Sequence, residues 1–263
     1  MKVLLTILFF IHLNTSFAND MRYYDIEIVI IENLTTDARN KENWPLEVNL
    51  NQAEKTVQLG EPVNSEWLPQ DVDLKSSYTV LKSSEYQLSD YIEKISESKK
   101  QRVIFHTAWR QPGLDKNQAL PVYFKREISA PPVINDEVIN MQNNEESPSY
   151  SESDQEPVST PSILEGILRV TLARYLHLEA ELTLRNKLPE ITKSDNPFTI
   201  LDNEKERMDL KKSGVIHLKQ KRRRIRSTEL HYLDHPVLSM LVRMTPYEKP
   251  EDDVVTSLNH KKK

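Results

Sequence analysis

The sequence predicts an α+β fold: a largely antiparallel sheet with one helix and long irregular, partly disordered insertions. Apolar and polar residues alternate over residues 168–185, with the period of two that is typical of strands buried on one face. Apolar residues recur at helical spacing over residues 84–99. Residues 131–162 contain seven acidic residues and neither Lys nor Arg, a composition that is typical of segments outside a packed core.

The composition excludes several classes of protein. The 263 residues carry a formal net charge of -5 and include no cysteine. Disulfides, thiolate zinc sites, iron–sulfur clusters and cysteine catalysis are therefore excluded. Beyond residue 20, no segment has the roughly 18 consecutive apolar residues of a membrane-spanning helix, so we expect no membrane span.

The first 18 residues have the pattern of a signal peptide. Lys2 forms a short basic region, residues 3–13 are mainly apolar, and the small residues Ser16 and Ala18 occupy the two specificity positions of a cleavage site. We expect cleavage after Ala18 and export to the periplasm of a bacterium with two membranes, or to the exterior. The loss of Lys2 makes the mature chain more negative than the full sequence.

These patterns divide the chain into five segments. They are a signal peptide at 1–18, an N-terminal β-α-β part of the domain at 19–130, an acidic disordered linker or insertion at 131–162, a C-terminal β-rich part of the same domain at 163–246, and a charged flexible tail at 247–263. The structured parts are long enough for one ordinary domain or two small ones, and we expect one.

The N-terminal part is expected to contain three strands and one helix. We expect strands at 22–32, 102–109 and 121–128, a helix at 84–99, and a long loop at 33–80. The first strand becomes continuously apolar after its start, which indicates that its second half is buried. Either Ser84 or Ser89 is expected to cap the start of the helix.

The C-terminal part is expected to consist of strands. The alternation over residues 168–185 predicts one bent strand or two consecutive strands, with Arg174 at the interruption. One face should be buried and the other exposed. Residues 215–225 and 236–244 predict two further strands, joined through a turn that contains residues 231–235.

The arginines near the end of the predicted strand 215–225 form the most conspicuous cluster of charge. On a strand, Arg222, Arg224 and Arg226 share one face and stand about 7 Å apart, and each guanidinium can form a bidentate contact with a carboxylate or phosphate. This pattern is typical of a site for a polyanion or a carboxylate-rich polymer. Alternatively, the arginines protect a sheet edge from aggregation or pair with Glu179 and Glu181.

Nucleic acid is not the expected partner of these arginines. The mature chain carries a net negative charge and is expected to be exported. No aromatic-rich recognition motif accompanies the basic residues, although such motifs are usual in nucleic-acid-binding modules. We therefore expect no nucleic-acid binding.

The segment that follows the arginines contains further polar candidates. His231, Asp234 and His235 could bind zinc and leave an open position for water, but their spacing matches no helical zinc-hydrolase motif. Asp234 and His235 could instead satisfy backbone groups in a turn. In a third interpretation, Glu229 and Asp234 accept ammonium groups while the arginines bind carboxylates.

No pattern of a catalytic nucleophile or a cofactor is present. The sequence lacks a Gly-x-Ser-x-Gly motif and a Ser-x-x-Lys motif with its usual companions. Glu179 and Glu181 could serve glycan cleavage, but they have the spacing of ordinary charges on an exposed strand face. Trp109 could stack on a sugar ring or fill the core at a strand end. We therefore expect a protein that is not an enzyme.

Four segments resemble the CsiV-type periplasmic peptidoglycan-binding proteins. They are residues 24–31 with Trp44-Pro45 following, residues 105–112, residues 174–177 and, most strongly, residues 223–236. The segments fall in the expected order and span nearly the whole mature chain. Thr228 and Ser239 stand where the family pattern has glycine.

The resemblance implies a non-enzymatic envelope protein that binds peptidoglycan. It further implies support of a class A penicillin-binding protein through that enzyme's outer-membrane lipoprotein activator. The candidate ligand-binding residues are Arg222, Arg224 and Arg226 for stem-peptide carboxylates, Glu229 and Asp234 for amines, and His231 and Trp109. The alternatives are a metal-dependent envelope hydrolase that uses His231, Asp234 and His235, and a pure protein–protein adaptor.

Overall fold

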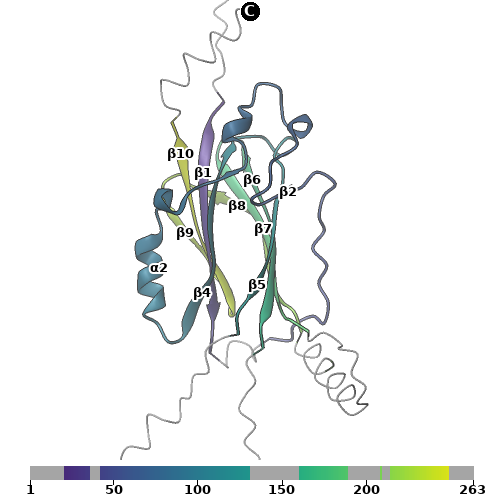
Figure 1. Cartoon of the computed structure of the whole chain (residues 1–263), viewed down its shortest axis with the longest axis vertical. Coiled ribbons are helices and arrows are strands. Elements are labelled where there is room, and N and C mark those ends of the chain that lie inside the picture. The colour runs from purple at the N-terminus through teal and green to yellow at the C-terminus, as the bar shows by residue number, and fades with distance from the viewer. Residues whose placement is uncertain (1–20, 36–41, 131–159, 189–207, 209–213, 249–263) are drawn as a thin grey trace, which may run out of the picture.

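Two facing sheets and one short α-helix form the described part of the chain (Figure 1). The computed structural model describes residues 21–35, 42–130, 160–188, 208 and 214–248. The first sheet consists of β1 (Tyr23–Asn33), β3 (Thr79–Val80), β4 (Gln101–Pro112), β9 (Leu230–Leu233) and β10 (Leu238–Tyr247), in the order β3-β4-β1-β10-β9. The second consists of β2 (Val57–Gln58), β5 (Val122–Ile128), β6 (Ser162–Leu172), β7 (Leu176–Asn186) and β8 (Ile216–Ile225), in the order β2-β5-β6-β7-β8.

The predicted α+β class with largely antiparallel strands is confirmed. Apart from the short parallel pair of β2 with β5, the described strand pairs are antiparallel. In chain order the helix lies between β1 and β4, with the short strands β2 and β3 also before it. β1 and β4 pair directly as antiparallel neighbours. The strands are divided between two sheets because each sheet buries one face against the other.

β1 lies at the centre of the first sheet, between β4 and β10, and both of its faces are buried. Ile28 points into the core between the sheets, whereas Val29 and Ile31 point to the opposite face, which α2 (Ser89–Ser96) covers. A strand buried on both faces does not need to alternate. This position explains the continuous apolar run in the second half of the strand.

The main core fills the space between the two sheets. Phe105 on β4 stacks on Phe124 on β5, with ring centroids 4.4 Å apart. Gly166 on β6 faces the same region, and a Cβ atom there would lie 2.6 Å from Cδ2 of Leu182 and closer still to the Phe124 ring. Glycine is therefore required where the Phe124 ring crosses β6, because no larger residue fits without displacing the core.

The helix is shorter than the sequence predicts, and its capping residue differs. α2 spans Ser89–Ser96, its N-cap is Leu88, and no side chain of the N-cap residue forms a capping hydrogen bond. Instead, the buried carboxylate of Glu27 on β1 accepts the backbone N–H groups of Gln87 (2.7 Å) and Leu88 (3.0 Å). The expected cap by Ser84 or Ser89 is wrong because an acceptor from a distant strand occupies that role.

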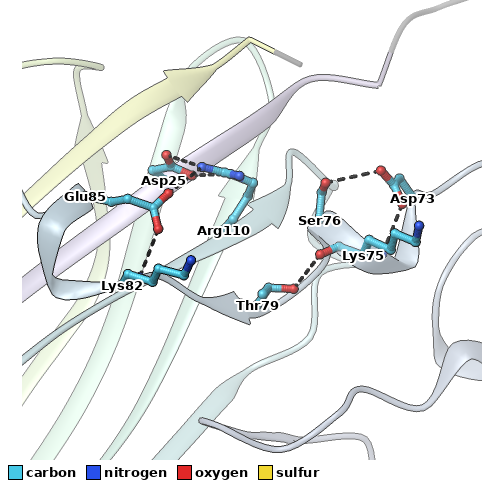
Figure 2. A network of polar contacts seen from close by, with 8 residues as sticks. All are labelled: Asp25, Asp73, Lys75, Ser76, Thr79, Lys82, Glu85 and Arg110. Atoms are coloured by element: carbon cyan, nitrogen blue, oxygen red, sulfur yellow. Dashed lines mark hydrogen bonds and ion pairs between the residues drawn. The ribbon is translucent and has the colours of Figure 1, made fainter. Parts of the chain in front are cut away.

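The segment before α2 contains three short 3-10 helices, η1 (Ser65–Trp67), η2 (Leu74–Ser76) and η3 (Ser83–Glu85). Figure 2 shows how polar contacts fix this segment to the first sheet. Arg110 on β4 donates two hydrogen bonds to Asp25 on β1, at 2.7 and 2.9 Å, and lies 3.7 Å from Glu85. Burial alone would lower the pKa of Arg110, but hydrogen bonding to Asp25 raises it overall. Arg110 therefore stays charged and anchors this segment.

The C-terminal strands follow the predicted positions with two differences. The alternating segment forms two consecutive strands, β6 and β7, and Arg174 lies in the turn between them. Residues 231–233 form part of β9 instead of a turn, because they pair with β10. β10 extends to Tyr247, where the sequence predicts the tail, and Tyr247 pairs with Tyr23.

The two sheets have a common end, which we call the Tyr247 end. There Tyr23 pairs with both Pro112 and Tyr247, and the backbone N–H of Gly113 donates to the carbonyl of Arg22. β8 also ends at this end, because the N–H of Thr228, just beyond it, donates to the carbonyl of Met244. The arginines of β8 therefore lie toward the Tyr247 end of the sandwich.

Three predicted segments fall wholly or mainly outside the described residues. They are the signal peptide at 1–18, the acidic insertion at 131–162 and the tail at 247–263. In the part of the chain that the structure describes, each helix is too short or too polar to cross a membrane.

Candidate functional site

The face of the second sheet that points away from the first sheet carries the candidate site, and we call it the outer face. Along β7, Leu178, Ala180 and Leu182 point into the core, whereas Glu179 and Glu181 between them are only partly buried and point outward. The prediction that one face is buried and the other exposed is therefore confirmed. The outer face is where side chains of this sheet can meet a ligand.

A β-bulge in β8 sets the direction of its arginines. Leu178 on β7 is opposite Arg223, but Ala180 is opposite Gln220, so β8 contains one extra residue across from Glu179. A bulge shifts the alternation of side chains by one position. After the shift, Arg222 and Arg224 are exposed, while Ile225 returns to the core.

Arg222 and Arg224 are available for contact with an anion. The guanidinium of Arg224 lies 3.4 Å from the ring centroid of Tyr175, which holds it by a cation–π interaction. The side chain of Arg222 has no hydrogen bond or ion pair within the described residues. His177 on β7 is the register partner of Arg224. Burial, followed by the charges of Arg222 and Arg224, lowers the pKa of that histidine.

The remaining candidates after β8 have partners of their own. Arg226 lies 3.5 Å from Glu229, and both side chains are exposed. Nε2 of His231 accepts the backbone N–H of Arg226 at 3.0 Å. Thr228, in the same turn, has a φ of 67°, in the left-handed region that favours glycine. Arg226, Glu229 and His231 therefore stabilise the connection from β8 to β9.

Asp234 and His235 lie away from the arginines, beyond the opposite end of β9. Nδ1 of His235 accepts the backbone N–H groups of Leu238 (3.0 Å) and Val237 (3.3 Å), as the turn interpretation expected for this residue. Burial lowers the pKa of His235, so the ring stays neutral and can accept these bonds. Glu229 precedes β9 and Asp234 follows it, and this strand of four residues is about 13 Å long.

The structure does not assemble the hydrolase site of the alternative hypothesis. Among the described residues, no three histidine, aspartate or glutamate side chains lie close enough to hold a metal ion together. His231 and His235 are instead engaged with the backbone at opposite ends of β9. Geometry therefore gives no support to metal ligation by His231, Asp234 and His235.

Trp109 is a core residue, and the interpretation that it stacks on a sugar is wrong. Its side chain is 1% exposed, and its indole N–H donates to Oε1 of Gln111 at 2.8 Å. A ring enclosed between two sheets cannot reach a polymer. The alternative prediction, that Trp109 fills the core at a strand end, is confirmed.

Sequence reasoning missed a pocket on the outer face beside Arg222. Its volume is about 450 Å³, and the charged residues of its lining come from three adjacent strands and one loop. They are Lys116, Arg169, Glu179, Glu181, Lys219, Lys221 and Arg222. The alternation in β6 and β7 places some of these residues on one face, but the bulge and the loop that complete the pocket leave no signal in the sequence.

Comparison with known families shows which family the chain belongs to. A family model described as "Peptidoglycan-binding protein, CsiV" matches residues 1–247. The chain belongs to the CsiV family. No curated protein and no solved structure matches the chain.

Membership of the CsiV family confirms the resemblance seen in the sequence. The matched region ends at Tyr247, the last residue of β10, so it includes every described strand of both sheets. The family description supports peptidoglycan as the ligand and the periplasm, where peptidoglycan lies, as the location.

Proposed function

We propose that this CsiV family member is a non-enzymatic periplasmic protein that binds peptidoglycan through the outer face of its second sheet. Arg222 and Arg224 bind carboxylates of the stem peptides. The observation that carries the proposal is that these two guanidinium groups are exposed, lie on one face and have no acidic partner within the described residues. Arginine suits this role because its planar fork matches the geometry of a carboxylate.

The contact with Tyr175 strengthens the case for Arg224. A guanidinium that already stacks on an aromatic ring has less conformational freedom to lose when it binds a ligand. Arg226 contributes positive charge just beyond the end of β8, although it also pairs with Glu229. Glu229 lies beside Arg226, whereas Asp234 lies beyond the other end of β9, so the two carboxylates would not bind amines at one point.

The cellular role in this proposal follows from the family resemblance. The protein supports cell-wall synthesis by a class A penicillin-binding protein through that enzyme's outer-membrane lipoprotein activator. A signal peptide cleaved after Ala18 delivers it to the periplasm. The role needs a binding surface rather than a catalytic group.

Sedimentation with protease-stripped peptidoglycan sacculi tests the proposed binding. The purified mature protein should pellet with the sacculi, and binding should weaken as salt is raised, because the contacts are charged and solvent-exposed. Arg222→Glu with Arg224→Glu should weaken binding at low salt by about tenfold or more, the size expected for the loss of charge-assisted hydrogen bonds.

The matched control is Lys99→Glu with Lys100→Glu, which makes the same change of charge at exposed positions just after α2, on the other side of the sandwich. This control should pellet like the wild type. Wild-type binding of the Arg222/Arg224 variant would refute the proposed site. Binding only to sacculi that retain their proteins would show an adaptor, and release of soluble fragments would show a hydrolase.

A further inference from the structure

The pocket beside Arg222 combines both signs of charge within one small volume. Glu179 on β7 lies between Arg169, its register partner on β6, and the bulge of β8 that contains Lys221 and Arg222. Lys116 approaches from the loop between β4 and β5. A carboxylate is therefore surrounded by cationic side chains on three sides.

The two carboxylates of the pocket differ in the hydrogen bonds that they accept within the protein. Glu181 accepts hydrogen bonds from Lys219 and His217, each at 2.9 Å. Burial alone would raise the pKa of Glu181, but these bonds lower it overall. Glu179 lies 3.6 Å from Lys116 and 4.0 Å from Arg169, distances beyond those of hydrogen bonds. Glu179 can therefore accept a hydrogen bond from an additional cation.

Two arginines of the pocket also have donor groups without an acceptor. Arg222 has no side-chain partner within the described residues, and Nε of Arg169 is buried without a hydrogen-bond partner there. A buried donor without an acceptor destabilises the folded protein. The lining carries five cationic side chains and two carboxylates, so it can accept a further anion.

We propose that this pocket binds an amino-acid zwitterion, with the ammonium on Glu179 and the carboxylate on Arg222 and Arg169. The source of this zwitterion rests on the proposed function. If the protein binds peptidoglycan, the ligand is the free amino-acid centre of a diaminopimelate side chain. Lysine at the same position of a stem peptide offers only an ammonium. It would leave the two arginines without an acceptor, so the pocket discriminates against it.

NMR titration of the mature protein with small molecules tests this inference without peptidoglycan. The probes are meso-diaminopimelic acid, pimelic acid, which lacks the amines, and cadaverine, which lacks the carboxylates. We expect diaminopimelic acid to shift the backbone amides around Glu179 and Arg222, and the other two probes to bind at least about tenfold more weakly, because each lacks one charge-assisted contact.

Two variants locate the binding within the pocket. Glu179→Gln and Arg222→Gln should each weaken binding of diaminopimelic acid by about tenfold or more. The matched controls, Glu127→Gln and Lys125→Gln, make the same changes of charge at exposed positions of β5 and should bind like the wild type. Arg222 has no partner to lose, so its variant keeps the test valid if Glu179→Gln fails to fold.

The outcomes separate this inference from the proposed function. Equal binding of the three probes, or wild-type binding by both pocket variants, would overturn the zwitterion site even if the protein pellets with sacculi. Selective binding of diaminopimelic acid that both variants lose would support the site. In that case, a failure to pellet would refute only the binding of the intact polymer.

Discussion

We predict that His235 couples the stability of the domain to pH. Its Nδ1 accepts two backbone N–H groups at the start of β10, which only an unprotonated nitrogen can do. Burial lowers the pKa of His235 below its ordinary value of 6.5, although Glu42 and Asp234 oppose this effect. Between the lowered pKa and 6.5, the unfolded chain binds more protons than the folded chain, so stability falls as the pH drops below about 6.5.

Replacement of His235 should reduce this pH dependence. In His235→Asn, the side-chain oxygen can still accept a backbone N–H but does not titrate. We expect the melting temperature of this variant to change less than that of the wild type between pH 7.5 and pH 5. The control is Asn64→Ala, which also removes a side chain that accepts a backbone N–H but does not titrate, and it should leave the wild-type slope. An unchanged slope in His235→Asn would contradict the prediction.

Thr228 shows what a departure from a family pattern can mean at the scale of one residue. The resemblance predicts glycine at this position, and Thr228 has a φ of 67°, in the left-handed region that favours glycine. The expectation of glycine therefore has a physical reason in the backbone of this turn. The sequence shows the departure, but the left-handed conformation becomes visible only in the backbone.

Among the elements, strands were predicted more accurately than the helix. The alternation in β6 and β7 is a local signal, and it located both strands. The start of α2 depends on Glu27, about 60 residues earlier in the chain, so no local pattern contains it. In the site, the exposed arginines could be predicted from their spacing, whereas the bulge opposite Glu179 could not.

The link between Glu27 and α2 gives a prediction at this scale. The carboxylate of Glu27 is almost fully buried, and besides Gln87 and Leu88 it contacts Nε2 of His106 at 2.7 Å. Glu27→Ala should lower the free energy of unfolding by about 3 kcal/mol, because it leaves buried donors without an acceptor. Urea unfolding measures the change.

The control for this variant is Glu85→Ala, in the segment before α2, whose side chain is partly exposed. We expect Glu85→Ala to lower the free energy of unfolding by less than about 1 kcal/mol, as is usual for exposed ion pairs. Equal losses in the two variants would show that Glu27 does not fix the start of α2.

For the whole molecule, the order of strands makes the two ends of the sequence interdependent. β1 has β10 as one of its neighbours, and ten residue pairs link them from Tyr23↔Tyr247 to Glu32↔Leu238. The core joins residues from both sheets in one cluster. The segments 19–130 and 163–246 should therefore fold together as one domain.

A fragment tests this expectation. Residues 19–130 alone lack β10 and the three strands that complete the second sheet. In this fragment β1 loses one of its two neighbouring strands, and the core loses most of the sheet that covers it on one side. We predict that this fragment shows poorly dispersed amide signals by NMR. The chain 19–248 is the control and should show dispersed signals. A fragment with dispersed signals would indicate two separate folding units.

The pairing of Tyr23 with Tyr247 affects how the protein should be attached to a sensor surface. Both ends of the domain emerge at the Tyr247 end, toward which Arg224 also lies. A tag placed directly after Tyr247 would hold this end against the sensor and shield the arginines from a polymer in solution. Attachment through a cysteine introduced at Lys99, beside α2, would leave the outer face of the second sheet open.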